Sequence, residues 1–456
     1  MPSPHPRALC WAALVAAAIP GLPSAGPLHA APGAEAARRA HPIVPRRPPQ
    51  FAEVVRRADS ERLASRYEQA ISLYREALAL RPRWEEGFWH VGLMQYDLDL
   101  YADARDAFRQ FVTLKPDGGA AWAFLAFCEY RLGEQQLARE HVERALRLGV
   151  GSYEDLHRVT HYHAGILMNR FGDFEQAYES LEKLAKTGDR DAKVVEALGI
   201  NLLRLQYLPE EVPVEKRELV LLAGRAAYAQ AAGRPEEARL HYAELLARFR
   251  ESPNVHYGYG TFLLSGDADA AMPEFRREIE ISPAHVEARL QLAYQHLKRG
   301  EYAEGLPYAE AATRLAPTLF TTRNCYGRLL LATGALERAV QEIEAARALE
   351  PGSAPVRFAL LQAYQRSGRA ADAEREGRAF QEIDGIRRAI QEGENQVRLS
   401  PKDARAHRQL AQAYVRSRRS AEARREQRIA EQIESAERSS RSGATATRAE
   451  TGVRAP

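Results

Sequence analysis

The chain has 456 residues, of which 45% are hydrophobic and 27% are charged, and its formal net charge at pH 7 is +3. The length exceeds what one compact core usually serves, and the composition is ordinary for a folded protein. The small net charge gives no support for a nucleic-acid-binding protein, which concentrates basic residues on one face. Cys128 and Cys325 lie far apart in the sequence, so we expect no intrachain disulfide.

Residues 1–30 are interpreted as an export signal. Arg7 precedes a short apolar run over residues 8–22, and small residues follow as far as Ala30. This order is typical of a secretory signal peptide, with cleavage expected after Ala30 or, as a second choice, after Ala25. The alternative is an uncleaved membrane anchor, for which the run is short. We therefore expect a periplasmic or secreted location in a bacterial envelope, with no transmembrane span after signal cleavage.

Residues 31–50 are rich in Pro, Ala and Arg and predict a flexible linker. The next segment, residues 51–66, is polar and predicts a helix that forms a loose cap on the following helices.

A small residue then recurs with a regular spacing along most of the chain. It occupies ten positions: Ala70, Ala104, Ala138, Ala177, Ala238, Ala271, Gly305, Ala339, Ala373 and Ala423. The commonest spacing is 34 residues, and prolines recur in the same phase at Pro82, Pro116, Pro283, Pro317 and Pro351. A small residue lets two helices approach closely, whereas proline ends a helix. The pattern predicts a series of helix pairs.

This pattern resembles the tetratricopeptide repeat family, whose repeat is also 34 residues long. The resemblance covers roughly residues 51–435 and is strongest over residues 85–118 and 286–353. It implies an all-α fold, a right-handed superhelical solenoid of about ten helix pairs (an α-α superhelix). Members of the family usually bind peptides or helices on the concave face of the solenoid.

Two spacings depart from this period. The 61 residues between Ala177 and Ala238 indicate a repeat whose second helix is lost or shortened, near Pro209 and Pro213. We expect a hinge there, between an N-terminal array over residues 51–207 and a C-terminal array over residues 208–380.

The second departure is the 50 residues between Ala373 and Ala423, which predict one extra helix within residues 378–396. Residues 381–435 would then hold this helix and the capping helices. Residues 436–456 are rich in Ser, Thr, Arg, Ala and Gly and predict a disordered tail.

The family register implies a partner-binding groove on the first helix of each pair. Its candidate residues are Trp89, Leu93, Tyr96, Phe127, Tyr130, Tyr162, Tyr228, Tyr257, Tyr294 and Arg328, with Tyr228 and Tyr257 one residue out of register. Aromatic side chains with a polar edge suit recognition of extended peptides. The alternative is that neighbouring helices cover these rings as ordinary packing.

Few residues suggest chemistry. His157, His161 and His163 form a weak candidate metal site, because two of them are four residues apart on one helical face. No third ligand is identifiable, and the chain lacks phosphate-binding, nucleophile-turn and paired-cysteine motifs. We therefore expect no cofactor, no catalytic residues and no enzymatic activity.

Residues 402–428 hold nine basic and three acidic side chains. They could meet an acidic partner, an anionic lipid surface or nucleic acid, but a solvated terminal helix with its own ion pairs is the favoured interpretation.

We expect an exported scaffold or adaptor that binds a protein or peptide partner through the concave groove and does not bind nucleic acid. A self-assembling structural envelope protein, stacked end to end, is the first alternative. A metal-dependent binder or enzyme at the histidine cluster is the less favoured one.

Overall fold

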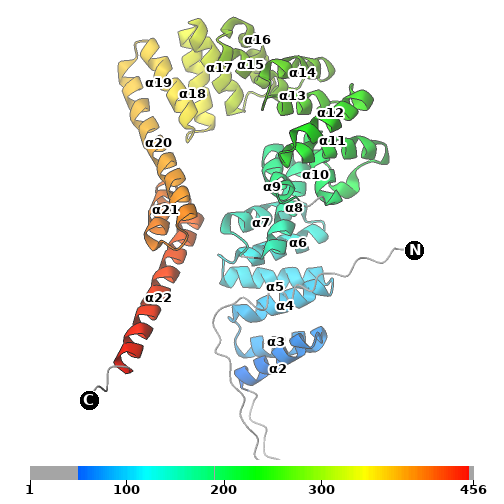
Figure 1. Ribbon diagram of the computed structural model, residues 1–456, viewed down its shortest axis with the longest axis vertical. Coiled ribbons are helices and arrows are strands. Elements are labelled where there is room, and N and C mark those ends of the chain that lie inside the picture. Colours follow the sequence, from blue (N-terminus) through cyan, green and yellow to red (C-terminus); the bar gives the residue numbers. More distant parts are fainter. Residues whose placement is uncertain (1–49, 152, 189–190, 451–456) are drawn as a thin grey trace, which may run out of the picture. The chain divides into compact units, whose positions relative to one another are not determined.

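The computed structural model describes residues 50–151, 153–188 and 191–450. Within these ranges every regular element is an α-helix or a short 3-10 helix (Figure 1). The described residues form two compact units, which are divided after Ala164. The predicted signal peptide and all but the last residue of the predicted linker lie outside the described residues. None of the described helices combines the length and apolar composition that a membrane span requires.

The first unit is a stack of helix pairs that ends in a helix shared with the second unit. Its helices are α2 (Phe51–Leu63), α3 (Tyr67–Leu80), α4 (Glu85–Asp97), α5 (Tyr101–Leu114), α6 (Gly119–Arg131), α7 (Gln135–Leu148) and the beginning of α8 (Glu154–Phe171). The recurring small residues Ala70, Ala104 and Ala138 have no exposed surface. Close approach at these positions therefore holds each pair together, as the spacing predicted.

The helix α2 is packed firmly on α3, which corrects the prediction of a loose cap. Val54 and Ala58 are fully buried. The Arg62 guanidinium donates to the Tyr74 hydroxyl over 3.0 Å, and that hydroxyl donates to Asp59 over 2.5 Å. The polar residues that suggested a loose helix therefore fix it in place.

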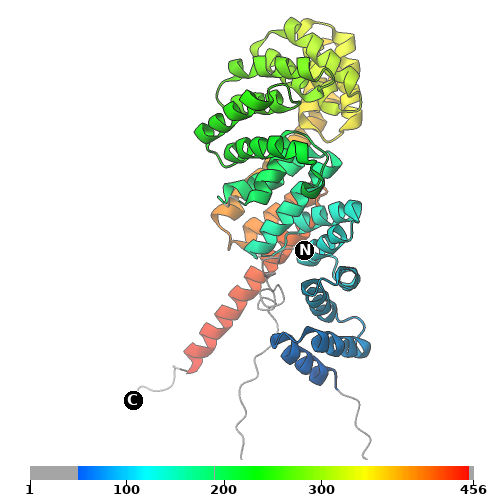
Figure 2. The same cartoon turned by 90° about the vertical axis from the view of Figure 1, so that its right-hand side faces the viewer.

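The second unit continues the same arrangement, and the stacking of its helices is visible in Figure 2. Its helices are α9 (Phe174–Lys186), α10 (Ala192–Leu202), η1 (Pro209–Glu211), η2 (Val214–Lys216), α11 (Arg217–Ala231), α12 (Pro235–Phe249), α13 (Val255–Leu263), α14 (Ala268–Ile281), α15 (Val286–Arg299), α16 (Tyr302–Leu315), α17 (Phe320–Thr333), α18 (Leu336–Leu349), α19 (Ala354–Arg366), α20 (Ala370–Leu399), α21 (Ala404–Arg416) and α22 (Ser420–Glu450). In chain order the described helices form ten pairs with α10 as an additional helix, so the prediction of an all-α solenoid of about ten pairs is confirmed.

The prolines between repeats also supply hydrogen-bond acceptors. In four repeats the side chain six residues after the proline contacts the proline carbonyl at hydrogen-bonding distance. The contacts are Trp122 to Pro116 (2.9 Å), Arg323 to Pro317 (2.6 Å), Arg357 to Pro351 (3.0 Å) and His407 to Pro401 (3.1 Å). These four connections between repeats are thus tied to the helices that follow them.

The helix α10 has no second helix after it, as the 61-residue spacing predicted. Residues 203–216 contain only η1 and η2, and α10 packs directly on α11. A Cβ atom on Gly199 would lie 1.9 Å from the Val220 carbonyl oxygen, and one on Gly224 would lie 2.1 Å from that of Val195. Two helix backbones approach this closely only where both carry glycine.

This contact bears on the predicted hinge. Val212 and Val220 belong to one buried core that also includes Ile200. The residues on both sides of Pro209 and Pro213 are therefore packed together inside the second unit. The structure places the division of the chain after Ala164 instead of after residue 207.

The 50-residue spacing has a different structural basis from the one predicted. The structure has no separate extra helix, because α20 continues without interruption for 30 residues. Its second half packs on α21: Gly393 lies beneath Leu410, and the Tyr414 hydroxyl donates to Glu394 over 2.8 Å. One long helix thus serves as the packing partner of both α19 and α21.

The helix α22 runs to Glu450, into the range that was predicted to be disordered from residue 436. Residues 402–450 contain no proline and many Ala, Arg and Glu residues, which have high helix propensity. The predicted disorder of residues 451–456 lies outside the described residues.

We predict that Gly199→Ala or Gly224→Ala lowers the free energy of unfolding by about 3 kcal/mol, because the added methyl group meets a backbone carbonyl that cannot move freely. Urea denaturation of the full chain measures this change. The matched control is Gly385→Ala in α20, where a Cβ atom meets nothing within 4 Å. That control should gain up to about 1 kcal/mol from helix propensity. Wild-type stability of both test variants would contradict the direct contact of α10 with α11.

Candidate functional site

Four of the predicted groove residues belong to the core. Trp89, Leu93, Phe127 and Tyr228 are at most 5% exposed. The Trp89 ring, for example, lies 5.6–5.7 Å from three phenylalanine rings of neighbouring helices. The prediction that these four side chains line an open groove is corrected, because neighbouring helices cover them.

The other predicted residues are more accessible. Tyr96, Tyr130, Tyr162, Tyr257 and Tyr294 are half-buried, and Arg328 is exposed. The structure brings Tyr130 and Tyr162 together around the His163 ring, with centroid distances of 5.1 and 5.7 Å. Burial raises the pKa of Tyr294 to about 12. That these accessible residues contact a partner remains a prediction.

The histidine cluster is not arranged as a metal site. His157 Nε2 lies 2.5 Å from the Gly151 carbonyl oxygen, and His163 Nδ1 lies 2.8 Å from that of Val159. No group of three or more His, Cys, Asp or Glu side chains in the described part of the chain is placed to hold a metal ion. The metal hypothesis for His157, His161 and His163 is therefore corrected, since backbone carbonyls engage two of the rings.

Two basic residues of the segment 402–428 form ion pairs with carboxylates of α22. Arg408 pairs with Glu434, and Arg419 pairs with Glu422 over 2.8 Å. These contacts agree with the favoured interpretation of a solvated terminal helix.

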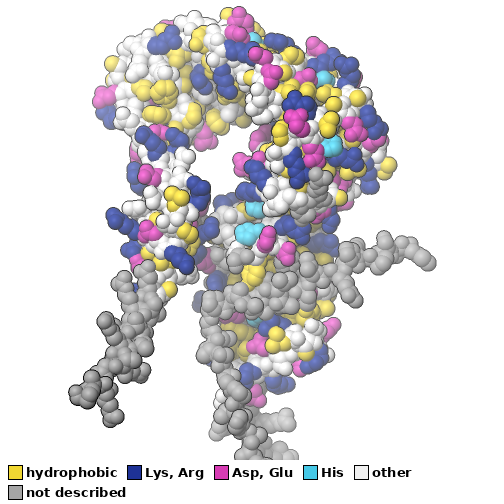
Figure 3. Space-filling model, viewed as in Figure 1, with side chains coloured by type: hydrophobic (Ala, Val, Ile, Leu, Met, Phe, Trp, Pro, Cys, Tyr) yellow, Lys and Arg dark blue, Asp and Glu magenta, His cyan; other side chains and the backbone are white. Residues whose placement is uncertain are grey.

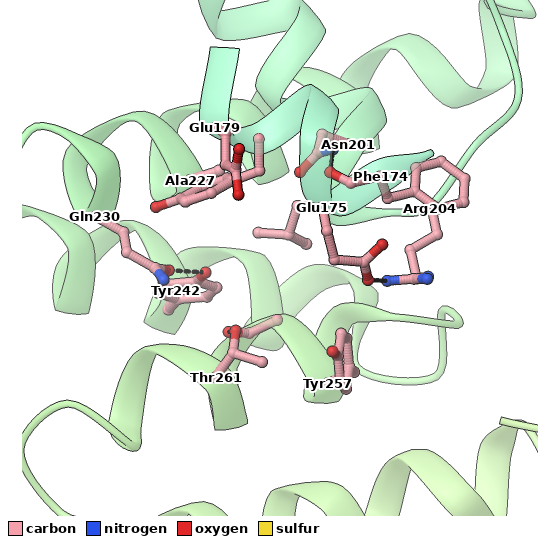
Figure 4. Close-up of a pocket in the computed structure, with 13 residues that line it drawn as sticks. Phe174, Glu175, Glu179, Asn201, Arg204, Ala227, Gln230, Tyr242, Tyr257 and Thr261 are labelled. Carbon is pink, nitrogen blue, oxygen red and sulfur yellow. Dashed lines mark hydrogen bonds and ion pairs between the residues drawn. The ribbon is translucent and has the colours of Figure 1, made fainter. Parts of the chain in front are cut away.

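A cavity of about 370 Å³ lies beside the incomplete repeat of the second unit. It is bordered by α9, α10, α11, α12 and α13 and by the turn that follows α10 (Figure 4). Its lining residues are Phe174, Glu175, Tyr178, Glu179, Asn201, Leu202, Arg204, Ala227, Gln230, Tyr242, Tyr257, Gly258 and Thr261. Of the residues predicted from sequence, only Tyr257 lines this cavity.

Aromatic side chains form much of the cavity wall. The Tyr242 side chain is fully buried, and its hydroxyl donates to the Gln230 side chain over 2.7 Å. Burial raises the pKa of Tyr178 and of Tyr257 to about 12, so both hydroxyls are protonated at neutral pH. Neither hydroxyl has a hydrogen-bond partner among the residues that the structure describes, so both can bond to a ligand.

Arg204 lies at the edge of the cavity and is held by charges and rings. Its guanidinium lies 3.1 Å from Glu175 and 2.8 Å from Glu287. It also stands 4.7 Å from the centroid of the Phe174 ring and 5.9 Å from that of Tyr257. In Figure 4 Arg204 and Glu175 point toward one another across the cavity edge. The positive charge of Arg204 is thus already compensated.

A buried carboxylate fixes the helix that carries Tyr257. Glu278 has no exposed surface, and it accepts hydrogen bonds from the backbone N–H groups of Asn254 (2.8 Å) and Tyr257 (3.2 Å). A carboxylate at a helix N-terminus satisfies backbone donors and interacts favourably with the helix dipole. Glu278 therefore sets the start of α13.

A second polar chain links α10, α13 and α15. The Asn254 amide donates to the Leu203 carbonyl over 3.0 Å, and its oxygen lies 3.0 Å from His285 Nε2. His285 Nδ1 accepts from the Ala288 N–H over 3.1 Å. The neutral tautomer with hydrogen on Nε2 satisfies both contacts. These residues have no distinctive signal in the sequence; only the 61-residue spacing marked the region as irregular.

One family model matches two stretches of the chain. A family model described as tetratricopeptide repeat matches residues 92–152 and 221–286. Together with the helix pairs and the buried small residues, this match shows that the chain contains tetratricopeptide repeats over these residues. No curated protein matches the chain.

Similar solved structures include MamA, residues 41 to the end, from Desulfovibrio magneticus. It is 22% identical over 38% of this chain and 96% of that one, with a TM-score of 0.34. Yeast Tom70 is 14% identical over 85% of this chain and 96% of its own, with a TM-score of 0.30.

Burial lowers the pKa of His285 to about 4, below its ordinary value of 6.5. The folded state therefore favours neutral His285, and this contribution to stability is complete above about pH 6.5 and is lost as the pH falls toward 4. We predict that the unfolding free energy of wild type, relative to that of His285→Gln, falls by up to about 3 kcal/mol between pH 7 and pH 4. Urea denaturation of both proteins at each pH measures this difference. A difference that is constant with pH would contradict this role.

We predict that Arg204→Ala lowers the free energy of unfolding by about 2 kcal/mol, because it removes two charge-assisted contacts of a side chain that is only 18% exposed. Arg204 also has a positive φ of 51°, which glycine adopts without strain. Arg204→Gly should therefore be about 1 kcal/mol more stable than Arg204→Ala. Thermal unfolding compares the two variants, and the reverse order would argue against the backbone effect.

Proposed function

We propose that the protein is a non-catalytic scaffold whose second unit binds an extended segment of a partner protein in the cavity beside α10. The observation that carries this proposal is the missing second helix. In its absence, α9 and α12 border an aromatic cavity with two available hydroxyl groups, on Tyr178 and Tyr257. Rigid aromatic side chains lose little conformational entropy on binding, so they suit this role.

The composition of the cavity favours binding over chemistry. Its thirteen lining residues include no histidine, cysteine, serine or lysine. Its tyrosines have raised pKa values, which makes them poor bases at neutral pH. Hydrogen bonding and apolar contact are the interactions that this set of side chains supports.

Export to a bacterial envelope is part of the proposal and is supported by the order of residues in segment 1–30. Tyr130 and Tyr162 in the first unit, and Tyr294 and Arg328 in the second, are proposed as additional partner contacts. End-to-end self-assembly is the alternative to a monomeric adaptor, and sedimentation over a concentration series separates the two.

The role of the cavity in binding is tested by a substitution that fills it with a large side chain. Random extended peptides are selected on the purified wild-type protein, and their affinities are then measured for Thr261→Trp, which places a large ring in the cavity. The control is Leu240→Trp on α12, at a position that is 72% exposed and outside the lining. We predict that Thr261→Trp weakens binding at least about tenfold, the size of a typical hot-spot loss, while the control binds as wild type does.

Circular dichroism and thermal unfolding first establish that both variants fold. Equal peptide affinities for wild type and Thr261→Trp would overturn the assignment of the cavity as the binding site.

A further inference from the structure

We propose that the cavity takes a basic side chain, a lysine or arginine of the bound segment, with Glu179 as its counter-charge. This inference rests on the proposed function and names the chemistry of the ligand. It is carried by the aromatic lining, by the charges at the cavity edge and by the environment of Arg204.

The lining has the chemistry of a cation site. Four of its thirteen residues are aromatic: Phe174, Tyr178, Tyr242 and Tyr257. The face of an aromatic ring carries partial negative charge and attracts an ammonium or guanidinium group, more strongly where water is excluded. Tyr178 and Tyr257 are half-buried, so water is partly excluded here, and this burial also raises the pKa values of both hydroxyls.

Among the charged side chains at the cavity edge, one carboxylate is available to pair with a ligand. Arg204 is the only cationic residue of the lining, and Glu175 and Glu287 already compensate it. Glu179 follows Glu175 by one helical turn on α9, is exposed, and has no ion-pair partner among the residues that the structure describes. The lining therefore carries one uncompensated negative charge.

Arg204 shows that this environment holds a cation. Its guanidinium lies near the rings of Phe174 and Tyr257 and contacts two carboxylates. A basic side chain of a partner would meet the same kinds of group, an aromatic ring and a carboxylate, one turn further along α9. Tyr178 supplies the ring there, and Glu179 supplies the carboxylate. A partner aspartate or glutamate would instead face Glu179 and be repelled.

No broad surface of a single charge competes with this site on the face shown in Figure 3. Acidic and basic side chains are interspersed over the visible part of the second unit.

The test uses two small probes that differ only in the ammonium group: Nα-acetyl-lysine N-methylamide and Nα-acetyl-norleucine N-methylamide. Each is titrated into the full-length protein, and the dissociation constant is measured by ligand-observed NMR. The wild type should bind the lysine probe more tightly, and Glu179→Gln should weaken that binding about fivefold without changing the norleucine probe. Glu179→Lys should abolish the preference for lysine.

The matched control is Glu236→Gln, which removes an equal charge from α12 at a side chain that is 83% exposed and outside the cavity lining. It should bind both probes as wild type does. Equal affinity of wild type for the two probes, or an equal effect of Glu236→Gln and Glu179→Gln, would overturn the proposal. Loss of peptide binding in Thr261→Trp would still support the cavity as the docking site, so the two proposals fail separately.

Discussion

Close approach of helices at small residues is the constraint on which both units depend. Most of the recurring alanines are completely buried, and each lets a neighbouring helix lie against its own. At the incomplete repeat the approach becomes a contact of two backbones, through Gly199 and Gly224. This contact lets α10 pack directly on α11 although the second helix of the repeat is missing. The core therefore continues from α10 to α11, and α9 and α12 lie on either side of the cavity.

Buried polar groups replace part of the lost helix packing. Glu278 caps α13, and Asn254 and His285 link it to α10 and α15. Every contact in this chain joins a donor to an acceptor, which is the condition under which a buried polar network is stable. The network fixes the ring of Tyr257 and the turn at Arg204 before any ligand arrives. A preformed site of this kind loses less entropy on binding than a flexible one.

The candidate site was only partly predictable because the first helices are apolar on more than one face. In α6, for example, all ten residues from Gly119 to Glu129 other than Ala120 are buried. A helix that is apolar all round gives no periodic signal that separates a core face from a groove face. The family register therefore assigned Trp89 and Phe127 to an open groove although both belong to the core. Tyr257, which the register treated as a weaker candidate, lines the cavity.

The sequence by itself determined the helix pairs, their number and the position of the incomplete repeat. These features depend on local spacing, on small residues at helix contacts and on prolines between helices. Only the tertiary structure decided where the chain divides, which aromatic rings stay accessible, and how the cavity is built. Its contacts join residues distant in the chain: Leu203 and Asn254 are separated by 51 positions, and Arg204 and Glu287 by 83. No local pattern records such pairs, because each depends on how the intervening helices stack.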